Sequence, residues 1–319
     1  MLAPVLLITF NRPDHVFRVL SAIRKEKPKS LYVFQDGPRE GMVDDVEKCA
    51  KVRSVISKLV DWRCDLHTFY SDYNYGCGAG PMTGINWFFS QVEEGIVIED
   101  DCLPHTDFWG YCEELLERYR DNPQVMYISS TLYDDLWRCE QSYGFSHYMI
   151  TGAWASWARA WKGFDLDLQN MDAKKFRQHC KKLLYSVVEA DWWYFKLIEI
   201  QRDQEKKSYW DYQMQIHLFQ NSGMTIHPKV NLVSNIGFDE EGTHTLINNG
   251  KGNLPSFSIL PLIHPTLMQV DLRRDYLCFA KSHSHGCIND FISRLYKNML
   301  FDRGISHNIL MLYKKLKNG

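Results

Sequence analysis

The sequence predicts an α/β fold with a mostly parallel central sheet flanked by helices. Short apolar runs at residues 5–10, 31–34 and 95–98 have the length of buried strands, and each leads into polar residues. Between the runs, apolar residues recur at intervals of three and four, which is typical of amphipathic helices. Strands that alternate with helices at this spacing favour right-handed crossovers between parallel strands.

Further elements are expected along the chain after the first strand. Asp14 follows a proline, which is typical of a helix start before the apolar positions of a first helix. The later elements are a helix over 52–59, a strand over 66–70, a helix over 85–92, the strand that ends at Glu99, a helix over 108–119 and a strand over 125–129. The alternation then loosens into aromatic-rich segments, which suits a substrate-side half of the fold.

These patterns divide the chain into three parts. Residues 1–104 form a nucleotide-binding α/β half, residues 105–250 a catalytic half of the same domain, and residues 251–319 a helical extension. Within 291–319, apolar residues at helical spacing accompany six Lys or Arg and one acid. Packing of this end on the parent domain or on a second subunit is favoured over contact with an anionic membrane surface, which such a segment also fits.

Composition limits the classes of function. A net charge of −2 gives no basic field for nucleic acid. The 14% of aromatic residues fits sugar binding as well as a packed core. Nine cysteines at irregular spacing predict reduced thiols rather than a disulfide framework. The start has no secretion signal and no segment has the length of a membrane span, so we expect a cytoplasmic protein.

Three adjacent acids, Glu99, Asp100 and Asp101, directly follow the apolar run 95–98. They are expected at the carboxyl edge of the sheet, where open α/β folds bind their ligands. A divalent cation that bridges to phosphates would satisfy such a cluster, and oxygen ligands suit Mg²⁺ or Mn²⁺. The alternative is that these acids only begin a loop or cap a helix.

Several segments together resemble GT-A glycosyltransferases. Residues 4–13 resemble their opening strand, 34–37 the end of their second strand, and 97–101 their metal-binding D-x-D equivalent, with motifs similar to those of N-acetylglucosaminyltransferase I. Five further segments resemble bacterial nucleotide-diphospho-sugar transferases, including a haemolytic-protein-like group: 74–78, 85–89, 210–213, 233–238 and 243–245. The resemblance spans residues 4 to about 245.

The resemblance implies a Rossmann-like GT-A fold and a metal-dependent, inverting transfer of a sugar from a nucleotide-diphosphate donor. A UDP-sugar is the expected donor, Mn²⁺ or Mg²⁺ the cofactor, and a glycan or lipid-linked acceptor of bacterial surface polysaccharide synthesis the expected partner. Such a role fits a cytoplasmic protein, also one that is peripheral at the inner face of the membrane through its basic C-terminus. An oligomer is compatible with the sequence.

Polar residues at the ends of the first two strands are candidates for binding uracil and ribose: Thr9, Asn11, Arg12 and Asp36. The resemblance implies that Asp36 accepts from the imide N–H of the base. The alternatives are a turn-forming Asp-Gly pair at Asp36 and a surface position for Arg12.

The glycines Gly76, Gly78 and Gly80 allow the backbone to approach the donor closely, or they merely start a helix. The resemblance implies that Asp101 binds the metal and that Asp100 and Glu99 contact the ribose or donor sugar. His244 is then a second ligand or a diphosphate contact, and the alternative is a solvated loop residue.

An inverting transfer needs a carboxylate that removes the proton of the acceptor hydroxyl. Asp211 is the candidate base, with a helix N-cap as its alternative role and Asp191 as the reserve base. Tyr212 stands where the similar motif of N-acetylglucosaminyltransferase I has a second acid. The position of the base is therefore uncertain by one residue.

Two further groups of residues, three tryptophans and a His/Cys cluster, each have a functional and a structural explanation. Trp154, Trp157 and Trp161 either form a wall for a sugar or pack in the core at helical spacing. A zinc site at 283–287 is disfavoured because two histidines and one cysteine lack a fourth ligand.

Two rival functions remain from the sequence. A sugar-nucleotide pyrophosphorylase needs a glycine-rich phosphate loop after the first strand, and residues 9–13 lack these glycines. A non-catalytic carbohydrate-binding or membrane-active protein on a degenerate scaffold is the other alternative, favoured by the aromatic content and the basic C-terminus.

Overall fold

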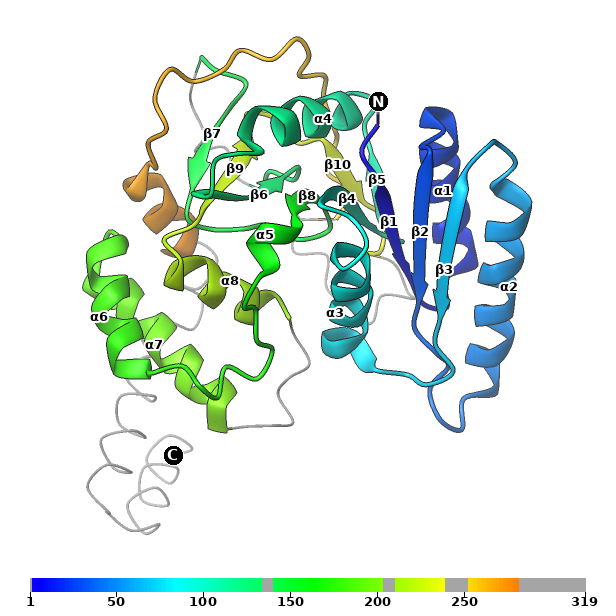
Figure 1. The fold of residues 1–319 in the computed structure, drawn as a ribbon, viewed down its shortest axis with the longest axis horizontal. Helices are drawn as coiled ribbons and strands as arrows, with labels where there is room; N and C mark the ends of the chain where they lie inside the picture. The colour runs from blue at the N-terminus through cyan, green and yellow to red at the C-terminus, as the bar shows by residue number, and fades with distance from the viewer. Residues whose placement is uncertain (1, 134–139, 203–209, 239–251, 281–319) are drawn as a thin grey trace, which may run out of the picture.

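The computed structural model describes residues 2–133, 140–202, 210–238 and 252–280. An eight-stranded sheet in the order β3-β2-β1-β4-β8-β6-β9-β7 forms the centre of the molecule (Figure 1). Its strands are β1 (Val5–Thr9), β2 (Ser30–Gln35), β3 (Asp65–Tyr70), β4 (Glu94–Glu99), β6 (Val125–Ser129), β7 (Tyr143–Ser146), β8 (Ala153–Trp157) and β9 (Met224–Pro228). β5 (Cys102–Pro104) and β10 (Val233–Asn235) form a second, two-stranded sheet.

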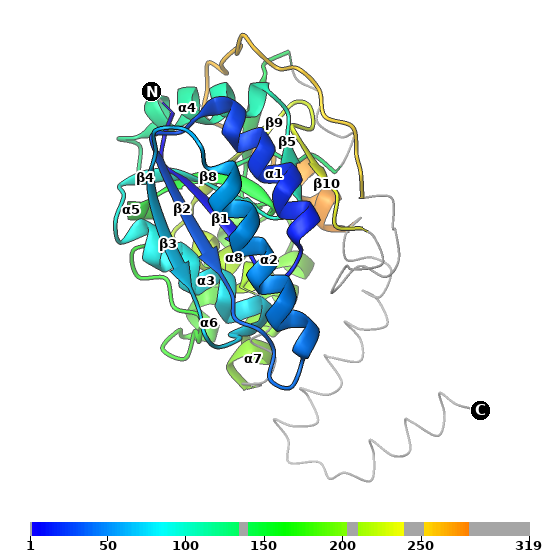
Figure 2. The ribbon, with the colours of Figure 1, turned by 90° about the vertical axis from the view of Figure 1, so that its right-hand side faces the viewer.

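Helices cover both faces of the large sheet, which confirms the predicted fold class. The helices are α1 (Pro13–Glu26), α2 (Val43–Leu59), α3 (Gly76–Phe89), α4 (Asp107–Tyr119), α5 (Ala158–Trp161), α6 (Ala173–Leu183), α7 (Val187–Arg202) and α8 (Asp211–Gln220). Figure 2 shows α1 and α2 side by side in front of β1, β2 and β3, and Figure 1 shows α3 on the opposite face.

Strands β1, β2, β3 and β4 are mutually parallel, and β1, β2 and β4 account for the continuous apolar runs of the sequence, whereas β3 is a mostly exposed strand at the edge of the sheet. In β1, Val5 and Leu7 pack in the core beneath α1, α2 and α4, whereas Leu6 and Ile8 pack in the core beneath α3. Successive side chains of a strand point to opposite faces, so a strand with both faces covered needs apolar residues throughout. The strands and helices predicted up to residue 129 are confirmed.

The helical spacing inferred for Trp154, Trp157 and Trp161 is wrong. Trp154 and Trp157 belong to strand β8, which is antiparallel to its neighbours β4 and β6, and only Trp161 is helical, in α5. Positions three apart in a strand point to opposite faces. Accordingly, Trp154 lies in the core beneath α3 and Trp157 in the core beneath α4.

The predicted helical extension is helical over only part of its described length. Residues 252–270 run over the molecule without a helix, and residues 272–280 form a helix (orange in Figure 1). Prolines at positions 255, 261 and 265 explain this, because proline lacks the backbone N–H that a helix interior requires. Asp107 holds the segment on α4 by accepting bonds from the backbone N–H groups of Ile259 (2.8 Å) and Leu260 (3.1 Å).

Across the described ranges, none of the helices has the length and apolar character that crossing a membrane requires.

Candidate active site

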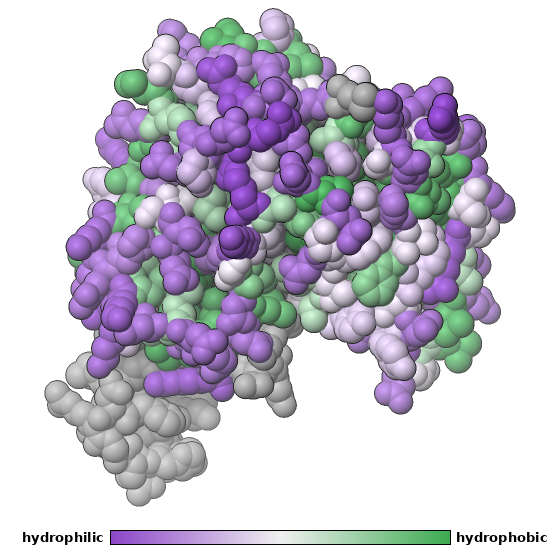
Figure 3. Space-filling model, in the orientation of Figure 1, coloured by the Kyte–Doolittle hydropathy of each residue, from purple (hydrophilic) through white to green (hydrophobic). Residues whose placement is uncertain are grey.

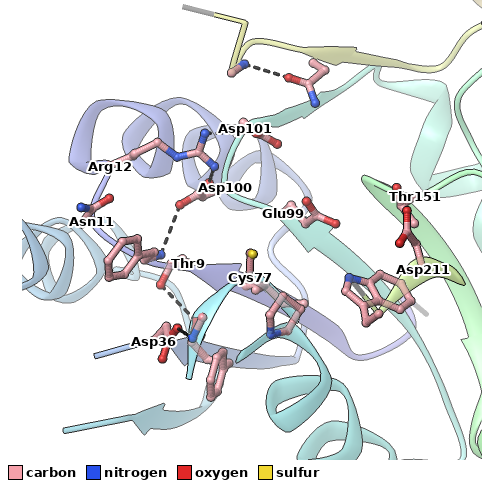
Figure 4. Close-up of a pocket in the computed structure, with 18 of the residues that line it drawn as sticks. Thr9, Asn11, Arg12, Asp36, Cys77, Glu99, Asp100, Asp101, Thr151 and Asp211 are labelled. Carbon is pink, nitrogen blue, oxygen red and sulfur yellow. Dashed lines mark hydrogen bonds and ion pairs between the residues drawn. The ribbon is translucent and has the colours of Figure 1, made fainter. Parts of the chain in front are cut away.

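The candidate active site lies at the switch point of the parallel strands. Strand β1 pairs with β2 on one side and with β4 on the other. The strand order therefore runs from β1 to β2 and β3 in one direction and from β1 to β4 in the other, which makes a switch point at β1. Ligands of open α/β sheets bind in the crevice outside the carboxyl ends of such strands. A cleft of about 670 Å³ opens at this point (Figure 4).

Most of the predicted site residues line this one cleft. They are Thr9, Asn11, Arg12, Asp36, Gly76, Glu99, Asp100, Asp101 and Asp211. Figure 4 shows Asp36 at the lower left, Arg12 and Asp100 above it, Asp101 and then Glu99 to their right, and Asp211 at the far right. The cleft therefore brings together segments that are up to about two hundred residues apart in the chain.

Asp36 is fixed by the loop that precedes α3. Its carboxylate accepts bonds from the backbone N–H groups of Gly37 (3.0 Å), Tyr75 (2.8 Å) and Gly76 (3.1 Å), and from the side-chain amide of Asn74 (3.2 Å). Burial raises the pKa of Asp36, while the three backbone bonds oppose the rise. Asp36 is thus an acceptor for the N-terminus of α3 as well as a wall of the cleft.

The glycines before and within α3 have separate reasons. Gly76 has a φ of +80°, a conformation that favours glycine, and begins α3 beside the cleft. A Cβ at Gly80 would lie 2.9 Å from the Asp36 carboxylate, so this position admits little more than a hydrogen. Gly78 is buried within α3 and is absent from the described lining of the cleft.

The polar side chains at the end of β1 and directly after it are held by neighbours. The Thr9 hydroxyl donates to the carbonyl oxygen of Phe34 (3.1 Å), and the Asn11 amide donates to Asp45 (2.7 Å). Arg39 donates to both oxygens of Asp45 (2.6 and 2.9 Å) and lowers the pKa of Asp45 to about 2. Arg39 lines the cleft, so this ion pair fixes a cation at its edge.

Arg12 bridges two of the three adjacent acids. Its guanidinium donates to Asp100 and, at 3.1 Å, to Asp101, and its side chain is only 17% exposed. Burial raises the pKa of Asp100, whereas the adjacent guanidinium opposes the rise. The alternative of a surface position for Arg12 is wrong, because the side chain is a largely buried counter-charge.

Two further carboxylates lie beyond this pair. Burial, reinforced by Asp101 and Asp100, raises the pKa of Glu99 to about 8. Burial also raises the pKa of Asp211, whereas the hydrogen bond from Tyr212 N–H and the charge of Lys196 oppose this rise. Asp211 is the first residue of α8 and Trp210 is its N-cap, so Asp211 does not cap this helix.

Gly237 lies directly over the acidic cluster. A Cβ at this position would be 2.4 Å from a carboxylate oxygen of Asp101 and 3.0 Å from a guanidinium nitrogen of Arg12. The backbone is held there because Ile236 N–H donates to the carbonyl oxygen of Asp101 (2.8 Å). Glycine therefore keeps a carboxylate oxygen of Asp101 free of side-chain contact from this segment.

The cleft offers few protein ligands for a metal ion. In the part of the chain that the structure describes, no group of three His, Cys, Asp or Glu residues is placed to bind a metal ion. Mg²⁺ is commonly bound by one or two carboxylates together with substrate phosphates. Asp101 and Asp100 fit a cation of this kind, which the two carboxylates would bind weakly by themselves and more tightly together with phosphates.

The structure does not bring every predicted residue to the cleft. Asp191 lies on α7, where Arg177 contacts both of its carboxylate oxygens at 2.7 Å, and it is absent from the described lining. Trp154, Trp157 and Trp161 are buried in the core, at 0%, 2% and 7% exposure. His244 and the residues 283–287 of the disfavoured zinc site lie outside the described residues.

Other residues of the cleft were not predicted. Tyr133, Thr151 and Cys77 line it together with Arg39. Thr151 reaches the site because it precedes β8, the antiparallel neighbour of β4, and Glu99 N–H donates to the carbonyl oxygen of Gly152 (3.0 Å). A φ of +116° at Gly152 marks a tight bend. The sequence signal for this bend is a Thr-Gly pair before an aromatic strand.

Comparisons with known proteins show resemblance at the level of structure. No family model and no curated protein matches the chain. Mannose-1-phosphate geranyltransferase from Thermus thermophilus is 11% identical, with a TM-score of 0.34 over 72% of this chain and 74% of that one. UDP-glucose pyrophosphorylase is 8% identical, with a TM-score of 0.37 over 74% of this chain and 93% of that one in complex with UDP-glucose. Its apo form is 8% identical, with a TM-score of 0.36 over 73% and 93%.

None of these three structures is described as a glycosyltransferase. TM-scores of this size do not identify a reaction. The activity must therefore be inferred from the residues of the cleft.

Proposed function

We propose that the protein is a glycosyltransferase that moves a sugar from a nucleoside-diphosphate donor to an acceptor hydroxyl, with a divalent cation. One observation carries the proposal: a single cleft at the switch point presents Asp36, then the Asp100–Asp101 pair, then Asp211 along its length (Figure 4). A nucleoside, a diphosphate and a sugar follow one another in the same order in such a donor.

The nucleoside is assigned to the end that contains Thr9 and Asp36. Phe10, Phe34 and Pro81 supply apolar surface there, next to polar groups that are already held in place. A group that is fixed before binding loses less conformational freedom when the ligand arrives. Uracil, whose imide N–H needs an acceptor, is the base that we favour for this end.

The diphosphate is assigned to the middle of the cleft, beside Asp101. Mg²⁺ or Mn²⁺ at Asp101 and Asp100 would neutralise the charge that develops on the leaving diphosphate. Arg12 is the protein's own cation at this position, since it already contacts both carboxylates. Rotation of Arg12 from the carboxylates toward the phosphates would exchange one anionic partner for another.

Asp211 is assigned the role of general base. Its carboxylate accepts the proton of the acceptor hydroxyl while the acceptor oxygen bonds to the anomeric carbon, and the carbon–oxygen bond to the diphosphate breaks with its electron pair on the diphosphate. Burial raises the pKa of Asp211, which makes the carboxylate a stronger base. Attack opposite the leaving group inverts the anomeric carbon.

The first experiment measures the thermal midpoint with UDP, GDP, CDP and ADP, each with and without Mn²⁺. A nucleotide at one hundred times its Kd stabilises the fold by about 2.7 kcal/mol, so one nucleotide should raise the midpoint in a Mn²⁺-dependent way. Asp101→Asn should abolish the Mn²⁺ dependence. A wild type that responds to none of the nucleotides contradicts the proposal.

The second experiment measures sugar transfer and slow donor hydrolysis. Asp211→Asn should keep nucleotide binding and lose roughly 10²- to 10⁴-fold in turnover, whereas the control Asp191→Asn should remain active. Nucleotide binding without turnover of any donor would favour the non-catalytic alternative. Release of pyrophosphate from a nucleoside triphosphate and a sugar 1-phosphate would instead show nucleotidyl transfer.

A further inference from the structure

The turn between α6 and α7 exposes apolar side chains at a corner of the molecule. Tyr185, Val187 and Val188 are 55%, 55% and 53% exposed, although Leu184 beside them is buried. Turns between helices are normally polar, because their side chains face water. Three half-exposed apolar residues within four positions therefore indicate a surface that binds an apolar partner.

The apolar surface continues onto a segment far away in the sequence. The ring of Tyr276, in the helix 272–280, lies 5.4 Å from the ring of Tyr185, and Leu277 is 43% exposed. We call Tyr185, Val187, Val188, Tyr276 and Leu277 the apolar corner. Because two packed helical elements support it, the corner is a fixed feature of the surface.

Basic side chains surround the apolar corner. Lys181 and Lys182 immediately precede the turn on the exposed face of α6. Lys174 and Lys175 lie seven positions earlier, two helical turns away on the same face. Figure 3 shows hydrophilic side chains predominating over α6 and α7 at its lower left.

Neighbouring acids cancel only part of this charge. Asp191 contacts both Arg177, at 2.7 Å, and Lys181, at 3.9 Å, and Asp172 lies 4.0 Å from Lys175. Glu189 is buried and accepts a bond from the Tyr148 hydroxyl (2.5 Å) rather than facing the lysines at the surface. The corner thus combines apolar side chains at its tip with a net positive rim.

We propose that the apolar corner and its lysines are a docking surface for an anionic lipid bilayer. Tyrosine and aliphatic side chains enter the interface of a bilayer, while flanking lysines contact anionic headgroups. This proposal concerns a surface away from the cleft and does not depend on the transfer reaction.

Charge decides between the bilayer and the other occupants. The segment 281–319 follows directly from the corner, and it carries seven Lys or Arg against two acids. The lysine rim would repel this segment, and it would equally repel the same corner of a second copy. An anionic bilayer attracts the rim and the basic segment together.

The test measures binding of the full chain to lipid vesicles by co-sedimentation. The wild type should bind vesicles that contain phosphatidylglycerol, should bind phosphatidylcholine vesicles much more weakly, and should lose binding as salt rises. The variant Lys181→Gln/Lys182→Gln should bind roughly thirtyfold more weakly, at the usual strength per lysine near an anionic surface. Its control is Lys51→Gln/Lys58→Gln on α2, where Lys51 also has an acid at 3.9 Å.

A second pair of variants tests the apolar part. Tyr185→Ser/Val187→Ser/Val188→Ser should bind at least tenfold more weakly, because less apolar area is buried. Val43→Ser/Val46→Ser is the control, since these α2 valines are 74% and 56% exposed. Equal losses in variant and control, unchanged binding of the turn variants, or no binding of the wild type to anionic vesicles would overturn the proposal.

Hydrogen exchange of the unmodified chain provides an independent measurement. Vesicles with phosphatidylglycerol should slow amide exchange in residues 183–188 and 272–280. Slowing only outside these segments would overturn the proposal, whatever the variants do.

Discussion

Replacement of Arg12 by alanine tests whether this side chain is the counter-charge of the acidic cluster. The guanidinium contacts Asp100 and Asp101, and the three side chains are 17%, 4% and 14% exposed. Removal of one partner from a buried ion pair costs about 3–5 kcal/mol, because the remaining charge is left without compensation. The partial exposure of Arg12 places the expected loss near the lower end of this range.

A loss of about 3 kcal/mol should lower the thermal midpoint by roughly 4–5 °C for a chain of 319 residues. Arg24→Ala is the matched control, because Arg24 also forms a two-point ion pair, with Asp61, but both side chains are about half exposed. Surface pairs of this kind contribute little, so this variant should keep nearly the wild-type midpoint. Differential scanning fluorimetry compares the two variants directly.

Mn²⁺ provides the second half of the test. In Arg12→Ala the carboxylates lack their guanidinium, so Mn²⁺ should raise the midpoint of this variant more than that of the wild type, where Arg12 competes for the same oxygens. Equal midpoints for the Arg12 and Arg24 variants would refute the counter-charge. Loss of stability without any response to Mn²⁺ would instead refute the metal site.

Three further outcomes are expected. Asp36→Asn should lower the free energy of unfolding by about 2 kcal/mol in chemical denaturation, because the new NH₂ group faces two donors of the α3 loop; unchanged stability with lost nucleotide binding would show that Asp36 acts on the ligand alone. Gly237→Ala should weaken Mn²⁺ binding in calorimetry, since its Cβ would lie 2.4 Å from an oxygen of Asp101. Burial raises the pKa of Asp275 to about 7, so the folded state keeps a proton that the unfolded state releases near pH 4. Stability should therefore fall as pH rises from about 4 to 7, by at most about 1.4 kcal/mol per unit, and Asp275→Asn should remove this slope. Asp172→Asn is the control, because the pKa of Asp172 is lowered and its contribution has the opposite sign.

The inner parallel strands β1, β2 and β4 were predictable because both of their faces are buried. Such strands need apolar residues at every position, and the runs at 5–9 and 95–98 stand out from their polar surroundings. The acids after β4 could also be predicted as cleft residues, since the carboxyl ends of parallel strands share one edge.

Strand β8 was not predictable from spacing. Trp154 and Trp157 are three positions apart, which matches a helix turn, but they point to opposite faces of a strand. Thr151 enters the cleft only because β8 pairs antiparallel with β4. Partners in different elements decide this pairing, and the local sequence carries no record of them.

The same limit applies to partners of charged residues. The sequence identified Arg12, Asp100 and Asp101 as site residues, but their direct contact spans 88 and 89 positions in the chain. Likewise, it offered Asp36 as a ligand group or a turn residue, whereas the structure gives it three donors from the loop before α3 and one from Gly37. The residue types predicted which residues belong to the site, whereas only the fold determined which of them contact one another.

The charge of the cleft bears on the nature of its ligand. Of the described residues that line it, five are acidic and two are arginines. Arg39 is bound to Asp45, and Arg12 is bound to two carboxylates of the cleft itself. Even with Glu99 protonated near neutral pH, an anionic diphosphate would meet an excess of negative charge. A ligand of this class therefore requires an accompanying cation, and the Mn²⁺ arm of the nucleotide experiment is the part that decides between the proposed donor and a neutral sugar.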